Sequence, residues 1–129
     1  MKTKKDEFWA VIPARSGSKS LKHKNIKFFL KRPLMVHSII SAKKNKLICF
    51  SSPFDETAVD FLEELQNPVY KVASSECVDL LLIKKIAKTK KPIIISTGMA
   101  SKKEIHEAVN CAKKNGCKQI ALLKCTSTY

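Results

Sequence analysis

The chain has 129 residues, which is enough for one ordinary domain and too few for two complete ones. Hydrophobic residues make up 44% of it, so extensive disorder is excluded and a packed core is expected. The formal charge is +14, but the lysines are scattered through every segment and no aromatic residues alternate with them as in a base-stacking surface. A solvated, lysine-rich surface is therefore favoured over a nucleic-acid-binding face.

The cysteines and histidines argue against a metal centre within the chain. The five cysteines form no CxxC pair, and the three histidines are far apart. No apolar run approaches the ~20 residues that cross a bilayer, and the first apolar run is too short for a signal peptide. We therefore expect a soluble cytoplasmic protein with reduced thiols and no membrane partner.

Short apolar runs alternate with amphipathic stretches, a pattern typical of parallel βα units. The runs do not alternate polar with apolar residues, as expected for strands covered on both faces. This indicates an α/β fold, either part of a TIM (β/α)8 barrel or an open five-stranded parallel sheet that includes the N-terminal strand. The expected strands are residues 8–13, 47–51, 69–73, 92–96 and 119–125.

A small, polar and basic loop, A-R-S-G-S-K-S at residues 14–20, follows the first expected strand. Free backbone N–H groups and nearby cations at such a strand end can surround a phosphate. The spacings of the Walker A loop and of G-x-G-x-x-G are both absent. Chemistry alone leaves open a phosphate site and an ordinary basic turn.

Three segments of this region resemble motifs of a known family. They are I-P-A-R-S-G-S-K at 12–19, K-N-I-K at 24–27 and K-R-P-L at 31–34. Together they resemble the opening of acylneuraminate cytidylyltransferases (CMP-sialic acid synthetases), which join a sialic acid to CTP. The family usually has G-K-P where this chain has K-R-P. The resemblance covers only residues 8–44 and excludes the family's acidic metal ligands and sugar-binding half. It implies that CTP would be held by Arg15, Ser18, Lys24 and Asn25.

The helices have readable ends. A helix is expected at residues 33–44, and residues 45–46 form the joint to the remainder of the chain. Asp55 and Asp79 can each cap a later helix, while Ser101 begins an S-x-x-E capping box and Gly116 ends the last helix. The expected apolar stripes are Ala58, Leu62 and Leu65; Leu82, Ile83, Ile86 and Ala87; and Ile105, Ala108, Val109 and Ala112.

Four later segments lie at successive strand ends: F-S-S-P-F-D at 50–55, Y-K-V-A-S-S-E at 70–76, I-S-T-G-M at 95–99 and L-K-C-T-S at 123–127. In this order and spacing they resemble N-acetylneuraminate (sialic acid) synthases over residues 47–129. That family condenses phosphoenolpyruvate with an N-acyl sugar such as N-acetylmannosamine. The resemblance implies the middle of a TIM barrel and a role in sialic acid or related nonulosonic acid biosynthesis.

The chemistry of phosphoenolpyruvate requires a cation and several hydroxyl or backbone donors for its phosphate and carboxylate. In a parallel barrel such groups belong at the carboxyl ends of the strands. By resemblance Lys71 is the charged anchor, Glu76 holds hydroxyls of the amino sugar, and Gly98 allows a sharp turn around the ligand. The alternative is that the serines are helix caps or turn formers and Lys71 a surface charge. The phosphoenolpyruvate-binding set is Ser52, Lys71, Ser74, Ser96 and Ser127.

The resemblance also implies a divalent metal, typically manganese, held by two histidines of later barrel strands. We expect neither these ligands nor the earlier strands in this chain. We therefore interpret the chain as a composite of two parts: a cytidylyltransferase-like segment, residues 1–45, and a partial synthase barrel, residues 46–129. Because half a barrel leaves unpaired sheet edges, we expect a homodimer. The alternatives to a synthase are a non-catalytic phosphate-binding fragment and a cytidylyltransferase remnant.

Overall fold

The computed structural model describes residues 9–11 and 27–125. The chain divides into two compact units, Met1–Cys49 and Phe50–Tyr129. In the first unit, β1 pairs with β4, and β2 forms an antiparallel hairpin with β3. Its elements are β1 (Trp9–Val11), β2 (Phe28–Phe29), β3 (Arg32–Pro33), α1 (Leu34–Lys44) and β4 (Ile48–Phe50), which runs into the second unit.

The β2–β3 hairpin was not predicted from the sequence. Its two turn residues, Leu30 and Lys31, have φ angles of 47° and 65°. Positive φ at both central residues is the requirement of a type I′ turn, which usually selects Asn and Gly. The Nε2 atom of His37, on α1, lies 2.7 Å from the carbonyl oxygen of Phe29. The hairpin therefore forms against the usual residue preferences of its turn.

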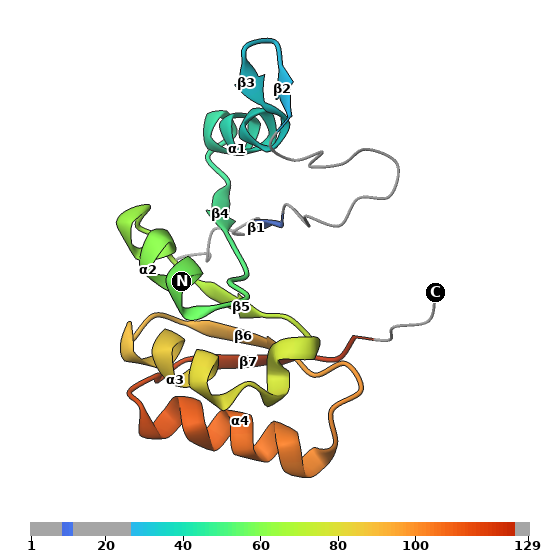
Figure 1. The fold of residues 1–129 in the computed structure, drawn as a ribbon, viewed down its shortest axis with the longest axis vertical. Helices are drawn as coiled ribbons and strands as arrows, with labels where there is room; N and C mark the ends of the chain where they lie inside the picture. The colour runs from blue at the N-terminus through green and yellow to red at the C-terminus, as the bar shows by residue number, and fades with distance from the viewer. Residues whose placement is uncertain (1–8, 12–26, 126–129) are drawn as a thin grey trace, which may run out of the picture. The chain divides into compact units, whose positions relative to one another are not determined.

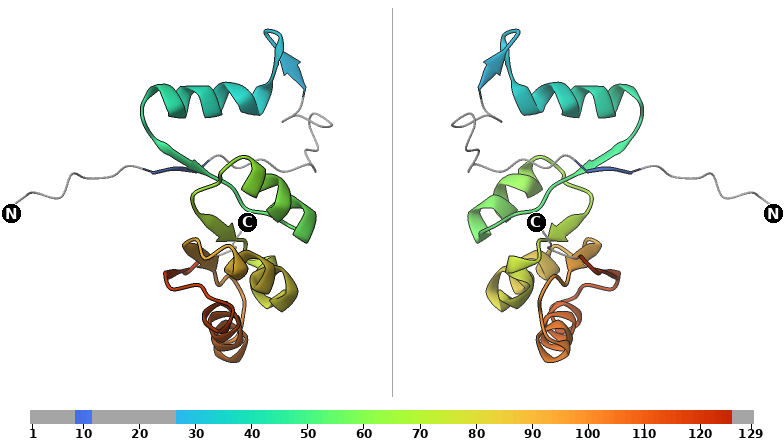
Figure 2. Two further views of the ribbon diagram at one scale, coloured as in Figure 1. Left: turned by 90° about the vertical axis from the view of Figure 1, so that its left-hand side faces the viewer. Right: turned by 90° about the vertical axis from the view of Figure 1, so that its right-hand side faces the viewer.

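The second unit confirms the predicted parallel βα units (Figure 1). Its three strands are parallel in the order β5-β6-β7. In the two side views, α3 and α4 lie along one side of these strands (Figure 2). The elements are α2 (Glu56–Glu64), β5 (Tyr70–Val72), η2 (Ser75–Val78), α3 (Leu80–Lys88), β6 (Ile93–Ser96), α4 (Lys102–Lys114) and β7 (Ile120–Leu123).

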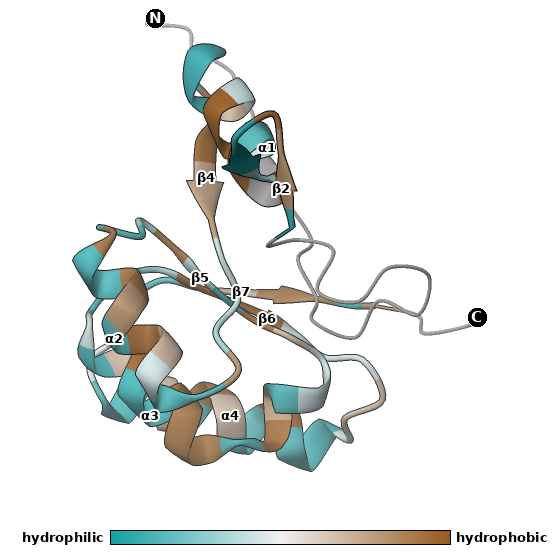
Figure 3. Cartoon of the chain, turned by 45° about the horizontal axis from the view of Figure 1, so that its top comes forward, coloured by the Kyte–Doolittle hydropathy of each residue, from teal (hydrophilic) through white to brown (hydrophobic). Residues whose placement is uncertain are grey.

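The core lies between the sheet and its helices. Tyr70, Val72 and Ile95 are fully buried in a cluster with the predicted apolar residues of α3. In Figure 3, brown stretches of hydrophobic residues recur between teal ones along α3 and α4. From α4, Ala108 and Ala112 are fully buried, and their small side chains allow the helix to approach closely.

The predicted helix starts are confirmed. The carboxylate of Asp55 accepts a hydrogen bond from the backbone N–H of Ala58, and Asp79 caps α3 in the same way. The capping box of Ser101 and Glu104 is present at α4. One predicted stripe was wrong at Leu65, which is 61% exposed because α2 ends before it.

The helix ends share one geometry. Each of α1, α2, α3 and α4 is followed, two positions beyond its last residue, by a residue with positive φ. In α2, the N–H of Gln66 donates to Glu63 and that of Asn67 to Leu62, the two bonds of a Schellman motif. Glycine is the usual residue at such a position, but only α4 has it. The four residues are Lys46, Gln66, Lys90 and Gly116.

The positive φ angle of Lys90 predicts that glycine at this position stabilises the fold, whereas glycine inside the helix destabilises it. We expect Lys90→Gly to raise the free energy of unfolding by about 0.5–1 kcal/mol, because φ of +60° is strained for lysine. Lys88→Gly is the matched control: it removes the same charge inside α3 and should cost about 1 kcal/mol. Urea denaturation measures both. Equal destabilisation by the two variants would contradict the assignment of strain to Lys90.

Candidate functional site

The strand register places several predicted ligand groups on one face of the sheet. Tyr70 and Val72 point into the helix-covered core, so Lys71 between them points to the opposite face. In the ladder, Lys71 is opposite Ile94. Ser96, two residues beyond Ile94, falls on the same face by the same alternation.

Ser52 joins this face through the end of β4. Ser51 forms a parallel bridge with Tyr70, and the N–H of Lys71 donates to the carbonyl of Ser51 at 3.3 Å. Ser52 follows Ser51, and Lys71 follows Tyr70. Since Ser51 and Tyr70 are bridge partners, the alternation places Ser52 and Lys71 at neighbouring positions on the face opposite the helices. The register thus assembles Ser52, Lys71 and Ser96.

The turns after β5 and β6 touch one another. Ser74 precedes η2, and its side chain makes no capping hydrogen bond. Gly98 has φ of +48°, and a Cβ atom on it would lie 2.4 Å from the Cβ and 2.9 Å from the Oγ of Ser74. Gly98 therefore permits a contact that any other residue would block, and it brings Ser74 against the turn that follows Ser96.

Two buried oxygen atoms have no hydrogen-bond partner among the described residues: Ser96 Oγ and Glu76 Oε2. Ser96 is completely buried, at 0% exposure. The other carboxylate oxygen of Glu76 accepts a hydrogen bond from Ser75 Oγ at 2.7 Å. Burying an unpaired polar atom costs about 1–3 kcal/mol, so two such atoms at adjacent strand ends indicate a place where a ligand's polar groups fit.

The serines at the strand ends differ from a serine that caps a helix. Ser101 does cap a helix, and its side chain accepts the N–H of Glu104. Ser74 makes no such bond, and Ser96 Oγ has no partner in the described chain. Capping therefore accounts for Ser101 and not for the two strand-end serines. Ser127, Arg15, Ser18, Lys24 and Asn25 lie outside the described residues.

Asn67 is a polar residue near this site that the sequence did not single out. It is 6% exposed, and its side-chain amide bonds to the backbone on both sides of the β4–β5 junction. The pair Asn67-Pro68 indicates a turn before a strand, which gives no hint that the amide is buried.

The described part of the chain does not fit the manganese site implied by resemblance. Within residues 9–11 and 27–125, no three or more His, Cys, Asp or Glu side chains come together as metal ligands. None of the helices in the same ranges is long and apolar enough to span a membrane.

The close approach of Gly98 to Ser74 gives a prediction. Gly98→Ala should destabilise the fold more than Gly116→Ala. Both residues have positive φ, but an added Cβ would lie 2.4 Å from Ser74 Cβ at Gly98 and 3.8 Å from the nearest atoms at Gly116. The additional loss should be about 1–3 kcal/mol, the usual cost of overpacking. Thermal denaturation of the two variants measures the difference. Equal losses would show that the two turns are not in contact.

The sequence is similar to a known protein family and to several curated proteins. The model of the NeuB family matches residues 4–129. The chain is 48% identical over 88 residues to a pseudaminic acid synthase of Helicobacter pylori, covering 68% of this chain. It is also 48% identical over 93 residues to an N,N'-diacetyllegionaminic acid synthase of Campylobacter jejuni, covering 70% of this chain.

Solved structures show the same relationship. An N-acetylneuraminic acid synthetase from Leptospira borgpetersenii, crystallised in complex with citrate, superposes with a TM-score of 0.67 at 29% identity, over 74% of this chain and 33% of the other. Such neighbours have a TIM-barrel-type fold, of which this chain forms a part. The chain spans 26% and 28% of the length of the two curated relatives.

Proposed function

The chain belongs to the NeuB family, and on this basis we propose that it serves nonulosonic acid biosynthesis by binding phosphoenolpyruvate at the carboxyl ends of β4, β5 and β6. The reaction of the whole enzyme is the condensation of phosphoenolpyruvate with an N-acyl amino sugar such as N-acetylmannosamine. The observation that carries the proposal is the hydroxyl of Ser96, which is buried without a partner among the described residues and lies on the same sheet face as Lys71.

The described groups match the chemistry of the ligand. Phosphoenolpyruvate carries a phosphate and a carboxylate, and Lys71 supplies a positive charge to pair with them. Ser52, Ser74 and Ser96 supply hydroxyl donors, and Ser127 completes the proposed set. Hydrogen bonds to such a charged ligand are stronger than those between neutral groups, which would compensate for the burial of Ser96.

Glu76 would hold the second substrate. One of its carboxylate oxygens is buried without a partner among the described residues, and a carboxylate accepts hydrogen bonds from sugar hydroxyls. With Lys71 holding the anion and Glu76 the sugar, the two would be brought together in an orientation suited to condensation. We propose these two residues as the catalytic pair of this chain.

Calorimetry with phosphoenolpyruvate tests the anion site. We expect Lys71→Met and Ser96→Ala each to weaken binding about tenfold or more, the usual contribution of a hydrogen bond to a charged group. Lys84→Met is the matched control, because Lys84 is an exposed lysine on α3 that carries the same charge. An equal loss in Lys84→Met would mean that the ligand responds only to net charge.

A coupled assay with phosphoenolpyruvate, N-acetylmannosamine and manganese separates the synthase from a non-catalytic fragment. Because the chain spans about a quarter of its curated relatives, we expect binding without turnover. Turnover would contradict this expectation and show that the chain holds every group that the reaction needs.

A second proposal concerns residues 1–45 as a cytidylyltransferase-like segment. The specific observation in its favour is the φ angle of +65° at Lys31, the position where that family usually has glycine. The segment would hold the triphosphate of CTP through Arg15, Ser18, Lys24 and Asn25, with residues 46–129 as the synthase part. The segment alone would not turn over, since it lacks the family's metal and sugar sites.

Binding of CTP tests this second proposal. Arg15→Ala or Lys24→Ala should abolish CTP binding measured by calorimetry, whereas Lys43→Ala, an exposed lysine near the end of α1, should leave it unchanged. Loss of CTP binding in all three variants would indicate general attraction to a basic surface instead.

We further propose that the protein is cytoplasmic and forms a homodimer. In the described sheet, β7 is an edge strand, and Leu122 and Leu123 are 53% and 46% exposed. A second copy would cover this apolar edge. Light scattering should give twice the mass of one chain, and a monomer at micromolar concentration would contradict the proposal.

A further inference from the structure

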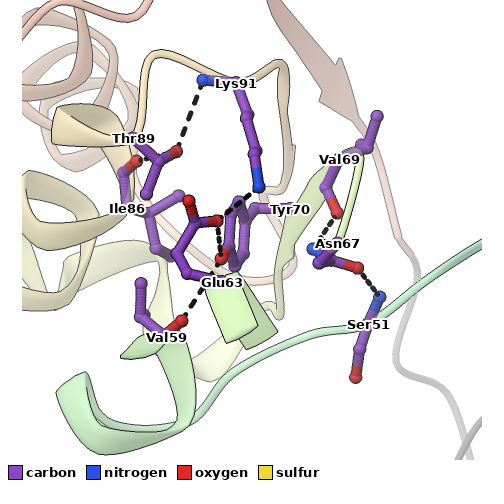
Figure 4. Close-up of polar contacts among 9 residues, drawn as sticks. All are labelled: Ser51, Val59, Glu63, Asn67, Val69, Tyr70, Ile86, Thr89 and Lys91. Atoms are coloured by element: carbon purple, nitrogen blue, oxygen red, sulfur yellow. Dashed lines mark hydrogen bonds and ion pairs between the residues drawn. The ribbon is translucent and has the colours of Figure 1, made fainter. Parts of the chain in front are cut away.

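The side chain of Asn67 links two backbone segments at the proposed anion site. Its Oδ1 accepts a hydrogen bond from the N–H of Ser51 at 3.2 Å, and its Nδ2 donates to the carbonyl of Val69 at 2.5 Å (Figure 4). Its backbone N–H is held by Leu62 at the end of α2. Asn67 is therefore fixed from both its backbone and its side chain.

The amide occupies a position that backbone groups normally fill. In a regular parallel ladder, Ser51 opposite Tyr70 would accept from Lys71 and donate to Val69. The first bond is present, from the Lys71 N–H to the Ser51 carbonyl. In place of a direct bond from the Ser51 N–H to the Val69 carbonyl, Asn67 Oδ1 accepts from the Ser51 N–H and Asn67 Nδ2 donates to the Val69 carbonyl. The side-chain amide thus lies between the two backbone segments as an additional peptide group would.

We propose that Asn67 is a positioning residue for phosphoenolpyruvate binding, acting through the backbone of Ser51 to hold Ser52 beside Lys71. This inference rests on the proposed function. Ser51 is attached to β5 by its carbonyl directly and by its N–H through Asn67, and the two attachments fix the direction in which Ser52 leaves the strand.

The role requires an amide of this length. A carboxylate at position 67 could accept from Ser51 but could not donate to Val69, and alanine could do neither. Asn67 is 6% exposed and Val69 4%, so water has little access to replace a lost bond. Asn67→Ala should therefore release Ser51, and Asn67→Asp, which keeps the shape, should have an intermediate effect.

Phosphoenolpyruvate affinity, measured by calorimetry at a temperature where circular dichroism shows every variant folded, tests the inference. We expect Asn67→Ala to weaken binding about tenfold, and Ser52→Ala to do the same. If Asn67 acts through Ser52, the double variant should bind within about twofold of Ser52→Ala alone, because the two changes remove one interaction.

Tyr70→Phe controls for general loss of stability. It removes the bonds from Tyr70 Oη to Glu63, at 2.6 Å, and to the carbonyl of Val59, and it leaves the two bonds from the Asn67 side chain to the backbone of Ser51 and Val69 in place. Its affinity should stay within about twofold of the unaltered chain. Additive effects of Asn67→Ala and Ser52→Ala, or an equal loss in Tyr70→Phe, would overturn the positioning role alone. Absence of binding by the unaltered chain would overturn the proposed function, and the inference with it.

Discussion

The alternation of side chains along β5 and β6 is the constraint on which the rest of the structure depends. One set of residues, including Tyr70 and Ile95, packs against the helices and is fully buried. The other set, including Lys71 and Ile94, must therefore face the opposite side. A shift of one residue in either strand would exchange the two sets, burying the Lys71 ammonium group and exposing the core. The core thus holds the proposed ligand groups in place.

The two ends of the strands have different roles. At the amino ends, Glu63 Oε1 lies 2.6 Å from both Tyr70 Oη and Lys91 Nζ (Figure 4). Burial raises the pKa of Glu63, but the hydrogen bonds from Lys91 and Tyr70 outweigh it and leave the pKa below its ordinary value. Burial and the Glu63 carboxylate together raise the pKa of Tyr70. Tyr70 Oη and Lys91 Nζ thus donate to the same carboxylate oxygen of Glu63.

The carboxyl ends of the strands contrast with this hydrogen-bonded network. Ser96 Oγ and Glu76 Oε2 are buried without partners in the described chain, and Gly98 is pressed against Ser74. In parallel barrels, ligands bind at the carboxyl ends of the strands, while the amino ends serve stability. Among the described residues, the hydrogen-bonded Glu63 network and the two unpartnered oxygen atoms follow that division. Asn67 links α2 to the proposed site, because its backbone N–H donates to Leu62 of α2 and its side chain accepts from the N–H of Ser51, next to Ser52.

The sequence by itself determined the order of strands and helices in the second unit and the caps at Asp55, Asp79 and Ser101, because these depend on local composition and spacing. The ligand candidates came from the resemblance of its strand-end segments to a family. Only the tertiary structure decided what depends on distant partners. Lys90 adopts a left-handed conformation that normally selects glycine, and the Asn67 amide enters a strand ladder. The side of the sheet that Lys71 faces is likewise settled by which of its neighbours pack against the helices. Such features arise when the packing of distant segments outweighs local preference, so no short stretch of sequence encodes them.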